Sequence, residues 1–189
     1  MFLELSAWGC FWRMNIYFKD IVLRAIEESD LNMLKDMMND PEIENVTGGY
    51  SYPVSSFQQR KWFENLQNRN NELRLIIETK EHGAIGIVML TNIDWKNRCA
   101  QSHSKIANGD FRGRGYGTMA SAALVNYAFK ELNLHCIYSH VLEHNEASKR
   151  VREKIGFIKE GILRDRVYKN GKYHNVEVWS IINTNNNNN

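Results

Sequence analysis

Residues 111–120 read "FRGRGYGTMA", which places three glycines and two arginines within the seven positions from Arg112 to Thr118. An apolar, helix-prone segment follows this loop without a break. Glycines let a backbone approach a bound group closely, and the first N–H groups of a helix point toward anions. The stretch therefore predicts an anion-binding loop between a strand over 99–107 and a helix over 118–131.

Three anionic ligands compete for such a loop. A nucleotide P-loop needs GxxxxGK[ST], and neither Lys-Ser nor Lys-Thr follows these glycines. A dinucleotide fingerprint needs GxGxxG in the first βαβ unit, whereas Gly113, Gly115 and Gly117 come late in the chain. The third pattern is RxxGxG, formed by Arg112, Gly115 and Gly117. A tight turn with no ligand remains the structural alternative.

Composition narrows the class of protein. The 189 residues are 43% apolar and 24% charged, which is typical of one ordinary globular domain. A net charge of +2 with no basic stripe argues against nucleic acid as a main partner. Cys10, Cys99 and Cys136 are odd in number and far apart. This spacing excludes a disulfide framework and a CxxC metal site and fits a cytoplasmic location.

The ends of the chain differ from its middle. Residues 1–13 are apolar but carry no basic n-region, so they predict an N-terminal extension rather than a signal peptide. No run is long enough to cross a membrane. The closing "NTNNNNN" is of low complexity. We therefore expect a single domain over 14–182 and a disordered Asn-rich tail over 183–189.

Hydrophobic periodicity predicts a mixed α/β fold. Met14 begins "MNIYFKDIVLRAI", which reads as a first strand, and Pro41 is expected to end the first helix. The order favours a central mixed, mostly antiparallel sheet of six to seven strands with helices on both faces. The predicted strands cover 21–26, 72–79, 84–93, 99–107, 135–143, 156–165 and 172–182, and the predicted helices cover 29–38, 55–69, 118–131 and 145–155.

The RxxGxG loop resembles the R/Q-x-x-G-x-G/A loop of the GNAT superfamily of acyl-CoA-dependent N-acetyltransferases. The stretch "LHCIYSHVLEHNEASKRVREKIGF" (134–157) resembles the next strand and helix of that family. Asn145 falls at its helix-opening asparagine, Ser148 at its small or hydroxylic position, and "KIGF" at its K-x-G-F. "EGILRDRVYKNGKY" (160–173) is similar to one branch, which holds ribosomal-protein N-terminal acetyltransferases and spermidine acetyltransferases. The resemblance covers roughly residues 20–182.

The resemblance implies acetyl-CoA as co-substrate, with no metal. Two central strands would splay apart around the thioester, and a backbone N–H near Ile106 would meet its carbonyl oxygen. Asn145 and Ser148 would lie beside the pantetheine arm. The coenzyme pyrophosphate would be held through backbone N–H groups of the loop residues Arg112, Gly113, Arg114, Gly115, Tyr116, Gly117 and Thr118.

Two positions depart from the family pattern. Many relatives carry a tyrosine that protonates the coenzyme thiolate, and this chain has Arg152 there. Arginine stays protonated and is no general acid, although its charge can stabilise a thiolate. The "AE-x-G-I" pattern appears as "AQSHSKI", with Gln101 in place of the glutamate. His103 shares the face of Gln101 and has an intrinsic pKa suited to a base; its alternative role is plain hydrogen bonding.

The leading hypothesis for the acceptor is a protein N-terminal amine of the ribosomal-protein type, with a polyamine or an amino sugar as the alternatives. A peptide α-amine with a pKa near 8 is already about a fifth neutral at pH 7.4, which favours a protein N-terminus of the ribosomal type. Residues 27–45 carry seven carboxylates against Lys35 alone, which favours spermidine or another cationic acceptor unless they form a solvated helix face. A basic cleft would favour a nucleotide-linked amino sugar. Tyr50, Tyr52 and Trp62 are expected to wall this cleft or to join the core.

A different class of function also remains open. Arg152 and Gln101 are compatible with a non-catalytic acyl-CoA-binding domain that has lost the chemistry. Cys99 and Cys136 lie outside any nucleophile motif, so an active enzyme would transfer the acetyl group directly. A homodimer remains open as well.

Overall fold

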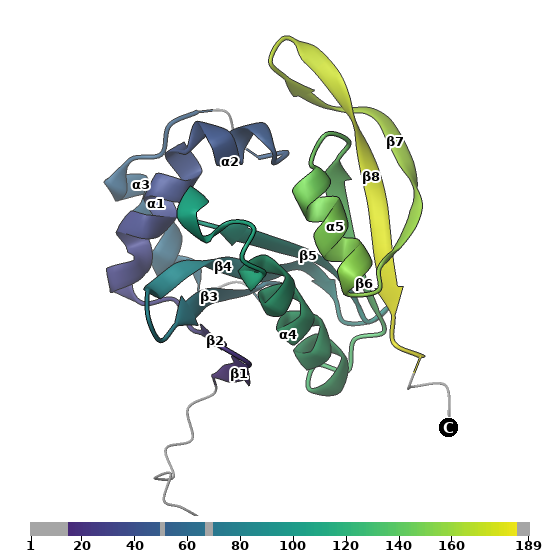
Figure 1. Ribbon diagram of the computed structural model, residues 1–189, viewed down its shortest axis with the longest axis horizontal. Helices are drawn as coiled ribbons and strands as arrows, with labels where there is room; N and C mark the ends of the chain where they lie inside the picture. Colours follow the sequence, from purple (N-terminus) through teal and green to yellow (C-terminus); the bar gives the residue numbers. More distant parts are fainter. Residues whose placement is uncertain (1–14, 50–51, 67–69, 185–189) are drawn as a thin grey trace, which may run out of the picture.

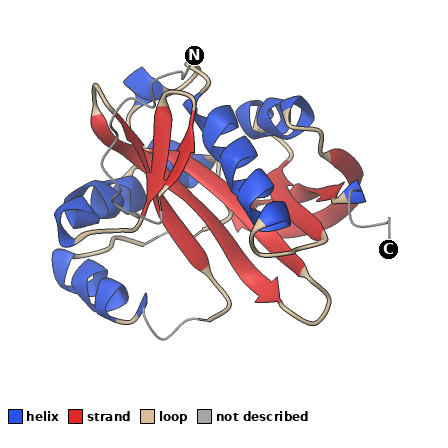
Figure 2. Cartoon of the chain, turned by 90° about the horizontal axis from the view of Figure 1, so that it is seen from below, coloured by secondary structure: helices blue, strands red, loops and turns tan. Residues whose placement is uncertain are grey.

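The computed structural model describes residues 15–49, 52–66 and 70–184, which form one eight-stranded sheet with helices on both faces (Figures 1 and 2). The order across the sheet is β1-β2-β3-β4-β5-β6-β8-β7, and every pair is antiparallel except β5 with β6. The strands are β1 (Ile16–Phe18), β2 (Ile21–Arg24), β3 (Leu73–Thr79), β4 (Gly83–Asp94), β5 (Cys99–Ile106), β6 (Cys136–Leu142), β7 (Ile158–Lys169) and β8 (Lys172–Ile182).

The sheet has one strand more than the six or seven expected, and the difference lies at its start. Residues 16–24 form a hairpin of β1 and β2 instead of one strand. The chain reverses at Lys19, whose φ of 52° lies in the left-handed region that tight turns require. The predictions for residues 1–13 and for the Asn-rich tail fall almost wholly outside the described residues.

The helices follow the predicted order with one addition. Pro41 does not merely end the first helix but opens α2, because Asp40 caps it by accepting from the Glu42 and Ile43 N–H groups at 2.7 and 3.4 Å. Ser55 caps the next helix as expected. The α-helices are α1 (Leu31–Asn39), α2 (Pro41–Asn45), α3 (Ser56–Glu64), α4 (Tyr116–Lys130) and α5 (Glu146–Lys154). In the described part of the chain, no helix has the length and apolar character needed to cross a membrane.

Two apolar clusters hold the layers together. On one face α4 packs on the middle of the sheet through buried Ala120, Ala123, Leu124 and Ala128. On the other face Leu34, Met37 and Ile43 of α1 and α2 pack on β3 and β4. The middle of the sheet is thus covered on both faces.

The strands β5 and β6 part from each other in the middle of the sheet. Their parallel pairing has three residue pairs, the last between Gln101 and Tyr138. β5 nevertheless stays paired with β4 as far as Ile106, and β6 stays paired with β8 as far as Leu142. The result is an opening between two strands whose outer ladders are intact, as the family resemblance predicts (Figure 1).

The C-terminal end of β5 lies close against β4 at Gly86. The pairing of β4 with β3 skips Ile85, a β-bulge, and Gly86 lies opposite Ile106. A Cβ at Gly86 would come within 2.3 Å of the Lys105 carbonyl oxygen. Only glycine therefore allows this approach, and no sequence pattern around Gly86 indicated the constraint.

We predict that Gly86→Ala lowers the free energy of unfolding by about 1–3 kcal/mol, because the methyl group must push the backbone of β5 away. Urea unfolding measures the effect. The matched control is Gly161→Ala on β7, where a Cβ meets no atom within 4 Å. Equal unfolding midpoints for the two variants would contradict the role given to Gly86.

Candidate active site

The glycine loop ends in an open helix N-terminus. Gly113 and Gly115 have φ values of 77° and 90°, which L side chains rarely adopt. Gly115 occupies the N-cap position of α4 and supplies no side chain, and the first helical bond runs from the Met119 N–H to the Gly115 carbonyl. The N–H groups of Tyr116, Gly117 and Thr118 therefore have no intrahelical partner and point out of the helix end.

The two arginines of the loop behave differently. Arg112 forms ion pairs with Asp40 at 3.0 Å and Glu42 at 2.7 Å, which tie the loop to α2. Arg114 is exposed and makes no ion pair with any described residue. Of the two charges, the one on Arg114 is available to a ligand.

A cavity of about 680 Å³ extends from the helices α1–α3 through the opening between β5 and β6 to α5. Its wall includes five of the predicted site residues, namely Gln101, His103, Asn145, Ser148 and Arg152. Ile106 and the loop 112–118 lie outside this wall, although a Cβ at Gly117 would touch the Ile106 side chain. Tyr52 and Trp62 also line the cavity, whereas Tyr50 falls outside the described residues.

Every second backbone N–H group of β5 points into the opening between β5 and β6. The Ala107 N–H donates to the Ile85 carbonyl on β4 at 2.8 Å. Since successive residues of a strand point their N–H groups to opposite sides, the Ile106 N–H points away from β4 and toward β6. The Ser102 carbonyl, which shares this orientation, accepts from the Ser139 hydroxyl of β6 at 3.1 Å.

The side chains of Gln101, His103 and Lys105 lie on one face of β5, and the side chain of Ser102 lies on the other. Nε2 of His103 is 3.0 Å from the Thr91 hydroxyl. Burial, followed by the positive charges of Arg152, Lys105 and Arg74 and by His140, lowers the pKa of His103 to about 4. These apolar and cationic surroundings oppose protonation of the imidazole and so weigh against the prediction that His103 acts as a base near neutrality.

Gln101 bridges two neighbours at the closed end of the opening. Its Oε1 accepts from the Asn92 amide at 3.3 Å, and its Nε2 lies 3.3 Å from Nδ1 of His140. Burial and then Arg166 lower the pKa of His140. Neither neighbour gives Gln101 the proton-accepting ability of the glutamate that it replaces.

Arg152 is a buried cation without a carboxylate. Its exposed fraction is 2%, and its Nη1 donates to the Ser102 hydroxyl at 3.4 Å. The guanidinium carbon lies 5.3 Å from the centre of the Phe157 ring, and Nε has no hydrogen-bond partner among the described residues. Burial lowers the pKa of Arg152 to about 10, so the group stays charged at pH 7 at a cost in stability.

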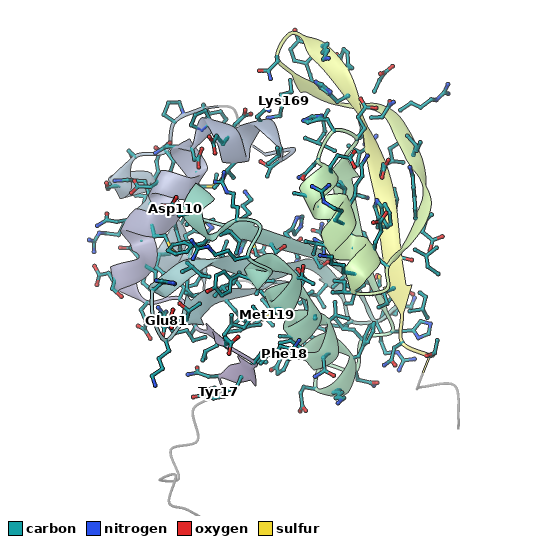
Figure 3. All side chains as sticks on the ribbon, viewed as in Figure 1. Tyr17, Phe18, Glu81, Asp110, Met119 and Lys169 are labelled. Atoms are coloured by element: carbon teal, nitrogen blue, oxygen red, sulfur yellow. The ribbon has the colours of Figure 1, made fainter. Side chains whose placement is uncertain are left out.

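Asn145 fastens α5 to α2 across one end of the cavity. Its Oδ1 caps α5 by accepting from the Ser148 N–H at 3.0 Å, and its Nδ2 donates to the Val46 carbonyl at 2.9 Å. Lys169 at the tip of the β7–β8 hairpin donates to the Glu44 carbonyl of α2 at 2.6 Å (Figure 3). The short helix α2 thus connects the glycine loop, α5 and the hairpin.

Most carboxylates of the acidic stretch 27–45 form ion pairs. Most of their partners come from elsewhere in the chain, which the local count against Lys35 could not reveal. The face stays largely solvated, since the side chains of Glu28, Asp36 and Glu42 are 65%, 73% and 76% exposed, and its carboxylates are already paired with cations of the protein. The pairs are Glu28 with Arg60, Asp30 with Arg24, Asp36 with Lys35, Asp40 and Glu42 with Arg112, and Glu44 with Lys169.

Comparison with known proteins assigns this architecture to a family. The family described as "Acetyltransferase (GNAT) domain" matches residues 20–158. The chain belongs to the GNAT acetyltransferases. It is therefore an N-acetyltransferase, and the expectation of acetyl-CoA as donor follows from the family.

Individual relatives of this GNAT chain cover different lengths. It is similar to the spermidine N(1)-acetyltransferase of Vibrio cholerae, with 31% identity over 86% of this chain and 92% of that one. It is similar to a putative ribosomal N-acetyltransferase of Bacillus subtilis, with 39% identity over 51% of this chain and 52% of that one. The crystal structure of the Vibrio cholerae spermidine N-acetyltransferase in complex with CoA and spermine superposes with a TM-score of 0.81, at 28% identity over 86% and 95% of the two chains.

Three charged residues that line the cavity were not predicted from the sequence. Arg74 on β3, Lys105 on β5 and Arg166 on β7 all line the cavity. Lys105 shares the alternation that singled out Gln101 and His103, so its face was predictable. Arg74 and Arg166 are brought in by distant strands. Among the described residues, no group of three or more His, Cys, Asp or Glu is placed to hold a metal ion.

We predict that Arg152→Met raises the free energy of unfolding by about 1–4 kcal/mol, because a well-packed apolar chain replaces an unpaired buried cation. Urea unfolding at pH 7 measures the change. Arg150→Met on the exposed face of α5 is the matched control and should leave the midpoint unchanged. A loss of stability in Arg152→Met would mean that the guanidinium stabilises the fold.

Proposed function

We propose that this GNAT acetyltransferase moves the acetyl group directly from acetyl-CoA to the primary amine of a small molecule. The observation that carries the proposal is the parting of β5 from β6 after Gln101 and Tyr138, which opens the sheet between the glycine loop and the 680 Å³ cavity. A thioester threaded between the strands would meet an amine that enters from the α1–α3 side.

The coenzyme would bind along the opened strands. Its pyrophosphate would accept from the N–H groups between Gly113 and Thr118, assisted by the free charge of Arg114. Arg112 would act indirectly, by holding the loop against α2. The pantetheine arm would lie beside Asn145 and Ser148, which line the cavity from α5.

Two groups would stabilise charge during transfer. Attack by the amine places negative charge on the thioester oxygen, and the Ile106 N–H is oriented to donate a hydrogen bond to it. Collapse of the tetrahedral intermediate expels the coenzyme thiolate. The unpaired guanidinium of Arg152 is suited to stabilise this thiolate by charge, in place of a tyrosine that would protonate it.

Deprotonation of the amine would not depend on a strong base of the protein. His103, with its pKa near 4, binds few protons at pH 7 and would serve as a neutral hydrogen-bonding group for the acceptor, with Gln101. The amine proton would pass to water. The rate should therefore rise with pH toward the pKa of the acceptor amine, with no limb near pH 6.

The cysteines give no support to an acyl-enzyme route. Cys99 and Cys136 are partners across the closed part of β5 and β6 and do not line the cavity. Burial raises the pKa of Cys136, followed by Cys99 and Glu160, so this thiol is less nucleophilic than usual. Cys10 falls outside the described residues.

Relatives bear on the acceptor class. The spermidine N-acetyltransferase of Vibrio cholerae matches over most of the chain, whereas the ribosomal-type relative matches over about half. These lengths favour a small amine over the expected protein N-terminus. Membership of the acetyltransferase family likewise favours an enzyme over a non-catalytic binding domain.

Thiol release from acetyl-CoA tests the proposed reaction, with spermidine, a basic peptide and a nucleotide-linked amino sugar as acceptors. We expect release with a small amine and little with the peptide. Arg152→Met should lower kcat at least tenfold while the KM for acetyl-CoA stays within threefold. Silence with all acceptors, or full activity of Arg152→Met, would contradict the proposal.

We predict that Arg114→Glu weakens acetyl-CoA binding at least tenfold, because it places a negative charge beside the coenzyme pyrophosphate. Calorimetry measures the dissociation constant. Lys130→Glu makes the same charge change at the opposite end of α4, about 20 Å away, and should bind normally. Equal affinities would remove the loop from the coenzyme site.

A further inference from the structure

The acceptor side of the cavity is positively charged. Four cationic residues line the cavity, namely Arg74, Lys105, Arg152 and Arg166, and none of the described lining residues is an Asp or a Glu. Arg152 faces the opening toward α5, where the thioester would lie. The other three charges belong to the side that would receive the amine.

Lys105 is a cation whose side chain has no partner among the described residues. It is half-buried on β5, opposite Ile87 of β4, and its ammonium group makes no hydrogen bond or ion pair with any of them. Burial and the charge of Arg74 lower the pKa of its ammonium group. A buried ammonium without a partner is costly unless a ligand supplies an anion.

Acetyl-CoA does not supply that anion. Its phosphates would be held at the N-terminus of α4, and α4 packs on one face of the sheet. Lys105 alternates with Ser104 and Ile106 along β5, so its side chain lies on the other face, beneath α1 and α2. The anion would therefore come with the acceptor.

Arg74 and Arg166 line the same cavity as Lys105. Glu72 holds the Arg74 guanidinium through Nε and Nη2 at 2.9 and 2.8 Å, and the guanidinium carbon lies 5.7 Å from the centre of the Trp62 ring. Arg166 extends from β7, is exposed and influences His140. The cations thus come from three different strands of the sheet.

A bare polyamine fits this environment poorly. It would add positive charges to a cavity that already holds cations, and the carboxylates of residues 27–45 are ion-paired elsewhere. Recognition of a cation normally uses carboxylates or aromatic faces, and only the second kind, in Tyr52 and Trp62, lines this cavity.

We propose that the acceptor is a small amine that also carries a carboxylate or a phosphate, bound by Lys105 in the cavity that Arg74 and Arg166 also line. This inference rests on the proposed function, since it names the substrate class of the same site. The amine would then approach the thioester with its anionic group turned back toward β3 and β7.

Calorimetry on protein saturated with CoA tests the inference without requiring turnover. The probes are O-phosphoethanolamine, β-alanine, ethanolamine and spermidine. We expect at least one of the two anionic amines to bind tenfold more tightly than ethanolamine and more tightly than spermidine. Comparison of the first two tells a phosphate site from a carboxylate site.

Variants of Lys105 make the test specific. Lys105→Met should weaken binding of the anionic probe at least tenfold, and Lys105→Arg should retain it within threefold. Lys96→Met, in the exposed turn at the other end of the β4–β5 hairpin, is the matched control. CoA affinity should be the same in all three, which also reports correct folding.

The contradicting outcomes are distinct from failure of the proposed function. Tighter binding of spermidine than of both anionic probes, failure of both anionic probes to bind, or normal affinity in Lys105→Met would overturn the inference alone. Failure of the wild-type protein to bind CoA would overturn the proposed function and this inference with it.

Discussion

The structure of the site depends on the short pairing between β5 and β6. β5 and β6 share three residue pairs, ending at Gln101 and Tyr138, while each keeps its pairing with the strand on its outer side. Two local features keep β5 on β4 beyond that point, namely the absence of a side chain at Gly86 and the hydrogen bond that the Ala107 N–H donates to the Ile85 carbonyl at 2.8 Å. The opening is therefore built into an intact sheet, so a ligand can bind between the strands without breaking any ladder.

Charge is distributed unevenly around this opening. Asp40, Glu42 and Glu44 form ion pairs that fasten α2 to the glycine loop and to the β7–β8 hairpin. Inside, Arg152 and Lys105 have no carboxylate partner among the described residues. A protein keeps unpaired buried cations at a cost in stability, which is typical of functional sites. In this account the missing anions are the coenzyme thiolate at Arg152 and the acceptor at Lys105.

The features that could be predicted from the sequence are those that are local along the chain. The RxxGxG loop, the cap formed by Asn145 and the two-residue alternation of β5 are all short-range patterns, and the structure contains them where they were expected. Features that depend on distant partners were missed or misread. The partners of the acidic stretch lie up to 125 residues away, as with Glu44 and Lys169. The low pKa of His103 likewise follows from its burial and then from charges such as Arg152 and Arg74, which no local pattern connects to it.

The central claim is that the Ile106 N–H in the opening of the sheet meets the thioester carbonyl. Amide proton chemical shifts of β5, compared between the CoA-bound and acetyl-CoA-bound protein, test it most directly. The account predicts that the Ile106 amide proton moves downfield with acetyl-CoA, because acetyl-CoA adds the thioester carbonyl that CoA lacks, while the Cys99 and Ala100 amides stay in place. An Ile106 amide that is the same with both coenzymes would contradict the claim.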